Sequence, residues 1–372
     1  MRTKRILLTG GGSGGHVFPL LAVADELRQK DYSDLEIFYL GPKSLINQEF
    51  ITRDIPVYGI ASSKLRRYFS FLNFIDIPKF FWSLIQALFR LYVLMPDVVF
   101  SKGGPGALAV VLAAKFYFIP VIIHDSDSVP GLTNKLSSKF AKRVGVAFES
   151  AAVYFDKNKV FISGNPIRAS LMRDIPPLSV AKTNLRLKKD EPLIFVWGGS
   201  QGAERINRFV FDNLDALLKN FQVYHQVGEK NLMEAQSVAQ SLPADFKEKY
   251  NFAGFMDANG IKTALSASDI VLARAGSGSI FEIAAFGKPS ILIPLEESAN
   301  NHQKANAYEF ARAGAAVVVE EANFTPNIVI VQIENILKDK NKYEAMALSA
   351  RKFAKPEAAK IIAGEILKLT NH

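Results

Sequence analysis

Two glycine-rich loops, about half a chain apart, constrain the fold of this sequence more than any other feature. The first spans residues 10–15 and follows an apolar run at 6–9, and the second spans 198–202 and follows an apolar run at 193–197. When a glycine-rich turn joins a strand to a helix, the free backbone amides and the positive end of the helix can bind a phosphate. Two such units therefore predict two phosphate-binding halves.

Short apolar strands alternate with helical patterns along the chain, which is typical of parallel, doubly wound sheets. We therefore expect an α/β fold with two Rossmann-like domains that face one another across a cleft. The expected division is 1–163 for the N-terminal domain, 164–353 for the C-terminal domain and 354–372 for a last helix. Strands are predicted at 5–9, 35–40, 56–60, 97–101, 120–124, 143–148, 160–163, 193–197, 222–227, 250–253, 269–273, 290–294 and 315–319, and helices at 18–30, 106–117, 131–141, 204–219, 279–286, 302–312, 327–337 and 341–353.

Composition narrows the class of protein further. The 372 residues are 49% hydrophobic, which is enough for a core in each of two domains. The chain has no cysteine, so disulfides and thiolate metal sites are excluded. The apolar run after the basic N-terminus is too short for a signal peptide, and we expect a protein that is not exported.

The N-terminal half is the more basic one. Residues 1–163 hold 20 Lys and Arg against 13 Asp and Glu, a net charge of +7 out of +9. Basic residues at 64, 66, 67, 79 and 90 flank an apolar stretch at 69–95, and a patch both basic and apolar suits an anionic membrane surface better than nucleic acid. We expect reversible binding without a membrane span, because residues 80–95 are too few to cross a bilayer and Gln86 and Arg90 interrupt them. The alternative is an ordinary core helix.

The first loop matches the dinucleotide pattern through Gly10, Gly12 and Gly15, but that reading needs a carboxylate after the second strand, where the chain has Gly41-Pro42. NAD and FAD are therefore disfavoured, and a tight turn without a ligand is the alternative. His16 follows the loop at the start of a helix and is a candidate general base. It could instead bond to a neighbouring backbone group.

The second half repeats this arrangement. A strand at 269–273 enters a Gly/Ser loop, and Glu282 one turn into the next helix could accept hydrogen bonds from both hydroxyls of a ribose. The alternative is a capping box formed by Ser279 and Glu282. The polar segment 295–307 could read sugar hydroxyls, or it could be a solvated loop with a helix cap. Asp125-Ser126-Asp127 resembles a metal-binding motif, but two carboxylates without further ligands make a poor metal site.

These motifs together resemble one family. Segments 11–19, 130–134, 164–168, 198–203, 282–285 and 302–307 match, in order and spacing, the peptidoglycan N-acetylglucosaminyltransferases that convert lipid I to lipid II, the MurG family. The resemblance implies the GT-B fold, with the donor UDP-GlcNAc bound mainly by the C-terminal domain and undecaprenyl-pyrophosphate-linked MurNAc-pentapeptide by the N-terminal one. It also implies that the last helix returns to the N-terminal domain, and that the protein works on the cytoplasmic face of the membrane as a peripheral enzyme without a metal cofactor.

Carried over residue by residue, the resemblance gives a role to each matching position. On the donor side, Ser13, Gly14 and Gly15 line the site, Arg168 and Ser200 lie near the phosphates, Met256 is at the uracil, Ser277, Gly278, Ser279 and Ile280 cradle the pyrophosphate, Glu282 holds the ribose, and His302 and Gln303 read the GlcNAc. On the acceptor side the corresponding positions are Gly103, Gly104, His124 and Asn134.

The chain departs from the family at two places. Residues 103–107 read Gly-Gly-Pro-Gly-Ala where the family usually has Gly-Gly-Tyr-x-Ser, and Asp127 stands where the family usually has Asn. In the implied reaction the C4 hydroxyl of MurNAc attacks C1 of GlcNAc with inversion. His16 is the first candidate for the catalytic base and Asp127, also expected at the donor site, is the second. Other UDP-sugar transferases with lipid acceptors, a non-catalytic nucleotide-sugar-binding membrane adaptor and a UDP-GlcNAc epimerase are the alternatives.

Overall fold

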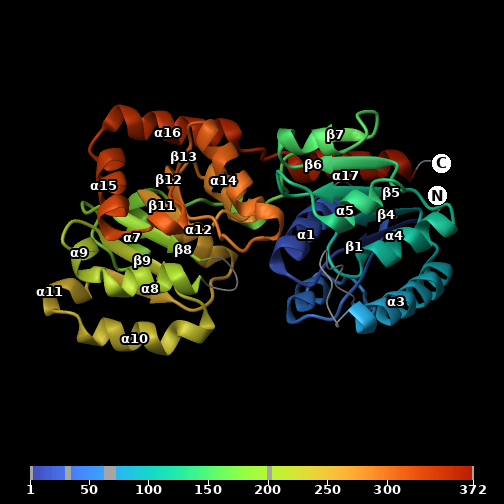
Figure 1. Ribbon diagram of the computed structural model, residues 1–372, viewed down its shortest axis with the longest axis horizontal. Coiled ribbons are helices and arrows are strands. Elements are labelled where there is room, and N and C mark those ends of the chain that lie inside the picture. The colour runs from blue at the N-terminus through green and yellow to red at the C-terminus, as the bar shows by residue number, and fades with distance from the viewer. Residues whose placement is uncertain (1–2, 30–34, 63–72, 199–202, 371–372) are drawn as a thin grey trace. The chain divides into compact units, whose positions relative to one another are not determined.

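The chain divides into two compact units, each with its own parallel sheet (Figure 1). This computed structural model describes residues 3–29, 35–62, 73–198 and 203–370. The first unit comprises residues 1–168 and 355–372, and the second comprises 169–354. Residues 164–168, which the sequence places in the second domain, pack with the first unit. Gly164 has a φ of +81° and lies so close to the Lys355 side chain that a Cβ there would overlap it, which requires glycine where the two crossing segments meet.

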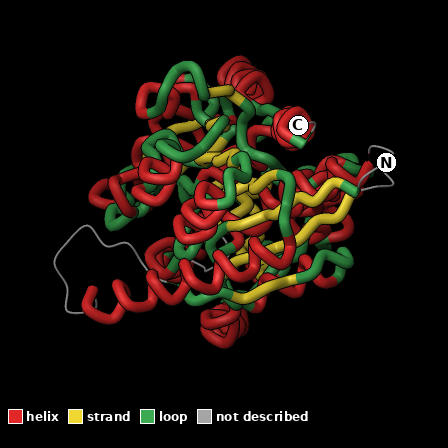
Figure 2. Tube along the Cα trace, turned by 90° about the vertical axis from the view of Figure 1, so that its right-hand side faces the viewer, coloured by secondary structure: helices red, strands yellow, loops and turns green. Residues whose placement is uncertain are grey.

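The first unit has a seven-stranded parallel sheet in the order β3-β2-β1-β4-β5-β6-β7. With the first unit facing the viewer, Figure 2 shows its strands between layers of helices. Its strands are β1 (Lys4–Thr9), β2 (Leu35–Gly41), β3 (Val57–Gly59), β4 (Val98–Ser101), β5 (Val121–Asp125), β6 (Arg143–Val146) and β7 (Val160–Ile162). Its helices are α1 (Gly14–Gln29), η1 (Leu45–Asn47), α2 (Gln48–Ile51), α3 (Asn73–Leu94), α4 (Ala107–Phe116), α5 (Leu132–Ser137), η2 (Glu149–Tyr154) and α17 (Ala358–Leu369).

Alternate residues of the strands build the two cores of the first unit. Ile6 and Leu8 of β1 pack in a cluster with α1 and with Ile362 and Ile366 of α17. Leu7, which points to the other face, packs in a cluster with α3 and α4. Burial on both faces explains why these strands are continuous apolar runs. The last helix is therefore part of the first unit's core.

The second unit has a six-stranded parallel sheet in the order β10-β9-β8-β11-β12-β13. Its strands are β8 (Leu193–Trp197), β9 (Gln222–Gln226), β10 (Tyr250–Ala253), β11 (Ile270–Ala273), β12 (Ser290–Leu292) and β13 (Ala316–Val318). Its helices are α6 (Ala169–Met172), α7 (Leu178–Asn184), α8 (Glu204–Asp212), α9 (Leu214–Leu218), η3 (Glu229–Asn231), α10 (Leu232–Ser241), α11 (Ala244–Lys247), α12 (Ala258–Ala267), α13 (Ser277–Ala285), η4 (Ala299–Asn301), α14 (His302–Arg312), η5 (Glu321–Asn323), α15 (Pro326–Leu337) and α16 (Lys340–Phe353).

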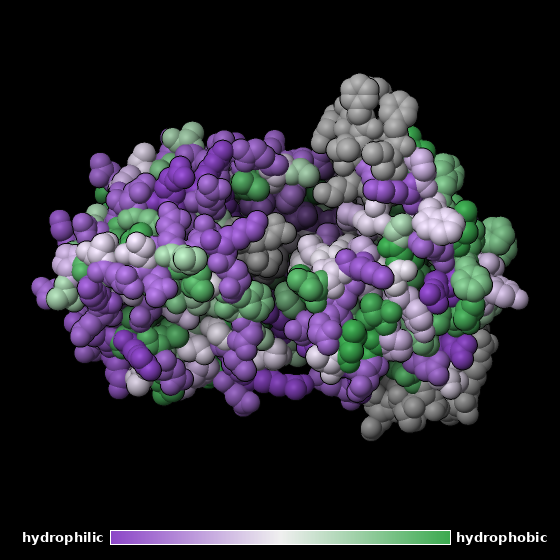
Figure 3. Space-filling view, turned by 90° about the horizontal axis from the view of Figure 1, so that it is seen from below, coloured by the Kyte–Doolittle hydropathy of each residue, from purple (hydrophilic) through white to green (hydrophobic). Residues whose placement is uncertain are grey.

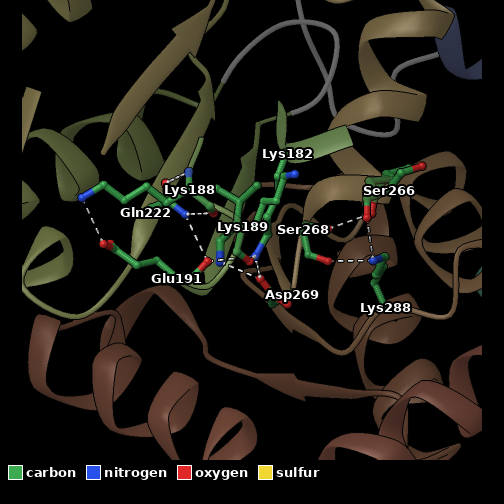
Figure 4. A network of polar contacts seen from close by, with 11 residues as sticks. Lys182, Lys188, Lys189, Glu191, Gln222, Ser266, Ser268, Asp269 and Lys288 are labelled. Carbon is green, nitrogen blue, oxygen red and sulfur yellow. Dashed lines mark hydrogen bonds and ion pairs between the residues drawn. The ribbon is translucent and has the colours of Figure 1, made fainter. Parts of the chain in front are cut away.

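A polar network ties the amino ends of this second sheet together (Figure 4). The buried Nζ of Lys182 lies 2.9 Å from Asp269 and donates to the carbonyl of Glu191 at 2.8 Å. Lys288 donates to the carbonyl of Ser268 at 2.6 Å, and burial lowers its pKa to about 8. This network lies at the opposite ends of the strands from the glycine-rich loops, so we read it as structural.

Helix α3 is longer than the sequence analysis expected. Residues 76–94 within it are long and apolar enough to cross a membrane by length and composition alone, so the expectation that residues 80–95 are too few for a span does not hold for the whole helix. Its polar interruptions have partners inside the unit: the Gln86 side chain accepts a hydrogen bond from the Ala61 amide at 2.8 Å, and the Arg90 guanidinium lies 5.0 Å from the centre of the Tyr58 ring. One face of α3 is thus packed against its own unit.

Candidate functional site

The predicted acceptor-side residues of the first unit lie in the loop after β4, in β5 and in α5, next to the loop after β1 and the start of α1, which carry Ser13 and His16. Strands β1, β4 and β5 are adjacent in the sheet, and the strand order changes direction between β1 and β4. In doubly wound folds, ligands bind at the carboxyl ends of the strands at such a point. The amide of Gly11 donates to the carbonyl of Gly103 at 2.8 Å, which joins the loops after β1 and β4 directly. The structure therefore brings Ser13, His16, Gly103 and Gly104 together.

His16 lies in the first turn of α1, and its ring is close to the backbone of Gly11 and Gly104. A Cβ added to Gly104 would lie 2.8 Å from Nε2 of the ring, and one added to Gly11 would lie 3.0 Å from Nδ1. The Oγ of Ser13 is 2.8 Å from Nδ1. Burial lowers the pKa of His16 to about 4, with a further lowering from the charge of Lys102 and an opposing effect of Asp127. The imidazole is therefore neutral at pH 7.

A buried lysine, which the sequence analysis missed, occupies the centre of this site. Lys102 follows β4 directly and is 3% exposed. Its ammonium donates to Nδ1 of His124, to Oγ of Ser126 and, at 3.3 Å, to Oδ1 of Asn165. Burial lowers its pKa to about 7, against the opposing charges of Asp125 and Asp127. The only sequence signal was a charged residue directly after a buried strand.

His124 is held in one tautomer by these contacts. Its Nε2 lies 3.0 Å from the carbonyl of Gly164 and 3.0 Å from Oγ of Ser163. A proton on Nε2 satisfies the Gly164 carbonyl and leaves Nδ1 to accept from Lys102. Burial and the Lys102 charge hold the pKa of His124 well below its usual range, so the ring stays neutral. It is 0% exposed, so it acts on the site through its neighbours.

Asp125 is engaged by hydrogen bonds from within its own loop and from α5. It accepts from Nδ2 of Asn134 at 2.9 Å and from the amide of Asp127 at 3.0 Å. Burial, followed by the charge of Asp127, raises the pKa of Asp125. The other atom of the Asn134 amide, Oδ1, is buried without a hydrogen-bond partner among the described residues and faces Gly103, where a Cβ would overlap it. Gly103 therefore has to be glycine, as its φ of +76° also requires.

Pro105 and Asp127, the two departures from the family pattern, lie close to the first glycine-rich loop and to His16, respectively. Pro105 lies beside the first loop, since a Cβ on Gly11 would be 3.1 Å from its Cδ. Asp127 is half-buried and exerts its charge on His16 and Lys102. Arg168, which is expected near the donor phosphates, lies with its guanidinium carbon 4.7 Å from the centre of the Phe18 ring.

In the second unit the predicted pyrophosphate cradle is the start of α13. The helix begins at Ser277 with Gly276 as its N-cap, and no side chain caps it. Ser279 is therefore the third helical residue, and it cannot form the capping box with Glu282 that was the alternative reading. Among the described residues, nothing lies within 4 Å of a Cβ placed on Gly276 or Gly278, so that part of the chain leaves space beside the first-turn amides. Glu282 is 8% exposed, one turn further into the helix.

The predicted sugar-reading residues lie at the entry of α14. Oε1 of Gln303 accepts from the amide of Leu295 at 3.1 Å, which fixes the loop that follows β12. Nδ1 of His302 donates to the carbonyl of Ala299 at 2.6 Å, which directs Nε2 away from this contact. Asn300 and Asn301 have φ values of 57° and 53°, the left-handed conformation that asparagine tolerates better than most residues.

Two further donor-side residues carried over from the family are Ser200 and Met256. Ser200 lies outside the described residues. Met256 is in the loop before α12, with its side chain 4% exposed. A ligand there would meet the backbone of Met256 rather than its thioether.

The second site also contains an arginine that the sequence analysis did not assign. Arg274 directly follows β11, donates to the carbonyl of Ile293 at 3.2 Å and is ion-paired with Glu321. Glu321 is also paired with Arg205. Burial lowers the pKa of Arg274 to about 10, which leaves it charged at pH 7. Its place after the strand that feeds the pyrophosphate cradle was visible in the sequence, but its partners were not.

Two doubly wound sheets, each with a glycine-rich turn at the end of its first strand, are the architecture of the GT-B glycosyltransferases. Residues 6–146 match the glycosyltransferase family 28 N-terminal domain, and residues 193–362 match the glycosyltransferase family 28 C-terminal domain. The chain belongs to glycosyltransferase family 28 and, within it, to the MurG family.

Particular relatives support this placement over nearly the full length. The chain is 36% identical to the UDP-N-acetylglucosamine–N-acetylmuramyl-(pentapeptide) pyrophosphoryl-undecaprenol N-acetylglucosamine transferase of Treponema denticola, over 97% of this chain and 94% of that protein. The crystal structure of Acinetobacter baumannii MurG is similar with a TM-score of 0.74 and 27% identity, over 98% of this chain and 99% of that one. The UDP-GlcNAc 2-epimerase of Neisseria meningitidis bound to UDP-GlcNAc, at a TM-score of 0.72 and 16% identity over 98% and 100% of the two chains, shares the fold.

Proposed function

We propose that this protein transfers GlcNAc from UDP-GlcNAc to the C4 hydroxyl of undecaprenyl-pyrophosphoryl-MurNAc-pentapeptide, with inversion at C1. The observation that carries the proposal is the 36% identity, over 97% of the chain, to a transferase named for this reaction. The oxygen of the C4 hydroxyl forms a bond to C1, and the bond from C1 to the β-phosphate oxygen of UDP breaks. The electron pair leaves with UDP, and the hydroxyl proton goes to a base.

The start of α13 is suited to the leaving group. The amides of Ser277, Gly278 and Ser279 have no partner within the helix, and together with the helix dipole they can stabilise a developing pyrophosphate charge. Glu282 would hold the ribose, and His302 and Gln303 would contact the GlcNAc. Ser13, Gly14, Gly15, Arg168, Ser200, Met256 and Ile280 complete the proposed donor site, for which we propose no metal ion.

His16 is the proposed base. Its ring is neutral at pH 7 because burial lowers its pKa to about 4, so it is in the protonation state that accepts a proton. Acceptance at Nε2 requires that Nδ1 carries the hydrogen and donates it to Ser13. Asp127 remains the second candidate. Gly103, Gly104, His124 and Asn134 would shape the acceptor side from the loops after β1, β4 and β5.

The same proposal gives each unit a role. The first unit, residues 1–168 and 355–372, would bind the lipid acceptor and the membrane, and the second unit, residues 169–354, would bind most of the donor. An exposed apolar face of α3 supports the membrane role, with side chains that are more than half exposed at Ile77, Phe81, Trp82, Ile85, Phe89, Tyr92 and Val93. Hydrophobic side chains also gather along the right-hand edge of the surface in Figure 3, on the side of the first unit. We propose peripheral binding to the anionic, cytoplasmic face of the membrane.

One assay tests the function. Purified protein is incubated with UDP-GlcNAc and a lipid I analogue, and the products are identified by mass spectrometry. We expect an acceptor heavier by one GlcNAc, together with free UDP. Transfer only to a different lipid would point to another UDP-sugar transferase, intact UDP-GlcNAc to a binding adaptor, and UDP-ManNAc without lipid to an epimerase.

A further inference from the structure

Lys102 is a fully buried lysine at the point where the acceptor-side loops meet. Its amide donates to the carbonyl of Thr9 at 2.8 Å, which fixes its backbone to the end of β1. Its side-chain nitrogen contacts the end of β5 through His124, the loop after β5 through Ser126, and the turn after β7 through Asn165. A single residue thus connects the ends of four strands.

The ionisable groups that act on Lys102 are two carboxylates and two neutral histidines. Asp125 and Asp127 both act on it as opposite charges, while His16 and His124 are neutral neighbours whose pKa values its charge lowers. Asp127 is the carboxylate that stands where the family usually has a neutral Asn. Without an internal cation, the acceptor side would present two carboxylates to a substrate that itself carries a pyrophosphate, and such like charges repel strongly when partly buried.

We propose that Lys102 is a positioning residue of the acceptor site: a buried amine that in its protonated form balances Asp127, and whose hydrogen bonds hold the loops after β4, β5 and β7 in register. This role rests on the proposed function only for its effect on turnover. Lys102 does not have to touch substrate, since it acts through Asp127, His16 and His124. A buried lysine that served only as a structural tie would hold the loops equally well but would not depend on the charge at position 127.

The test is a charge-balance cycle of Lys102→Met, Asp127→Asn and the double variant. Lys102→Met leaves the site with one negative charge too many, and we expect kcat/KM for the lipid acceptor to fall about tenfold or more, mainly through KM. Adding Asp127→Asn restores the wild-type charge and should recover most of that loss. Lys182→Met is the matched control, because Lys182 is an equally buried lysine, 2.9 Å from Asp269 in the second unit.

A substrate-free measurement separates this inference from the proposed function. Side-chain NMR titration of the five histidines, with His16 assigned by its substitution, should show a higher His16 pKa in Lys102→Met than in wild type. The double variant should return the value toward wild type, and Lys182→Met should leave it unchanged. These shifts are expected whichever sugar acceptor the enzyme uses.

The inference is overturned if His16 titrates identically in wild type and Lys102→Met, or if Asp127→Asn gives no recovery in the Lys102→Met background. Should Lys102→Met not fold, Asp127→Asn alone answers the question. Removing that carboxylate should lower the pKa values of both His16 and Lys102, the latter read from the Cε carbon shift. Unchanged titration of both groups would then refute the charge balance.

Discussion

Oγ of Ser13 lies 2.8 Å from Nδ1 of His16, and this contact decides which nitrogen of the ring can accept a proton. If the Ser13 hydroxyl accepts a hydrogen bond from Nδ1, Nε2 is unprotonated and faces Gly104. If the hydroxyl donates instead, Nε2 carries the hydrogen and cannot serve as a base. The proposed mechanism requires the first arrangement.

Ser13→Ala should therefore lower kcat by about three- to tenfold, because the ring loses the group that selects its tautomer. Steady-state kinetics with both substrates measure kcat and donor KM, and Ser13→Thr, which keeps the hydroxyl, is the matched control. A rise in donor KM at constant kcat would show that the hydroxyl serves donor binding alone and does not orient the base.

His16→Ala should lower kcat by roughly 10²–10⁴-fold, the usual contribution of a general base, with a smaller change in donor KM. Asp127→Asn restores the residue usual in the family and separates the two candidates. With His16 as base, kcat of Asp127→Asn should stay within a few fold of wild type. A collapse of kcat in Asp127→Asn beside a mild effect of His16→Ala would make the carboxylate the base.

The pH profile follows from the same residue. Burial lowers the pKa of His16 to about 4, so the neutral form persists as the pH falls from 8 and is lost only as the pH approaches that value. We expect kcat/KM for the acceptor to show no acid limb near pH 6.5, the ordinary value for histidine. An acid limb at pH 6–7 that disappears in His16→Ala would show that the ring is far less desolvated than its surroundings indicate.

The sequence predicted the strands well, because strands buried on both faces are unbroken apolar runs such as 193–197. Helices were predicted less completely. α12 was missed, although its apolar residues do recur at helical spacing. The expected helix at 204–219 is divided at Asn213, whose side chain donates to the carbonyl of Phe209 at 2.8 Å. Such a break depends on a local hydrogen bond that periodicity does not encode.

The local structure of the candidate site was predictable where it depends on backbone shape and not where it depends on buried charge. Glycine and serine after a strand identified the start of α13, although Ser279 and Glu282 imitated a capping box until the helix start was known. Lys102 was not identified, because lysine is so rarely buried that its environment has to be seen. Its partners come from segments up to 63 residues away in the chain.

Glu282→Ala should raise the KM for UDP-GlcNAc strongly, because the ribose loses a carboxylate that can accept from both hydroxyls. Because Glu282 does not cap α13, the substitution should leave thermal unfolding little changed. Isothermal titration with UDP checks the ligand and thermal unfolding checks the fold. Normal UDP affinity in Glu282→Ala would remove the ribose role.

Turnover should survive EDTA, because backbone amides and a helix dipole are proposed to meet the leaving pyrophosphate. The measurement is the initial rate before and after chelation, with Mg²⁺ added back. Activity that is lost in EDTA and returns with Mg²⁺ or Mn²⁺ would contradict the proposed metal-free chemistry.

Replacement of Phe81, Trp82 and Phe89 by Ser should weaken sedimentation with anionic lipid vesicles, because these side chains are 58%, 57% and 62% exposed on the outer face of α3. The inner face is held by buried Ser83, Ala87 and Leu91, so the fold should survive. Salt should weaken vesicle binding of wild type, since it screens the basic residues of the first unit.

Met233→Ser and Leu348→Ser, at exposed apolar positions of the second unit, are the controls and should bind vesicles as wild type does. Unchanged sedimentation of the triple variant would exclude this face of α3 as the membrane contact, and release of wild type only by detergent would favour a span by residues 76–94.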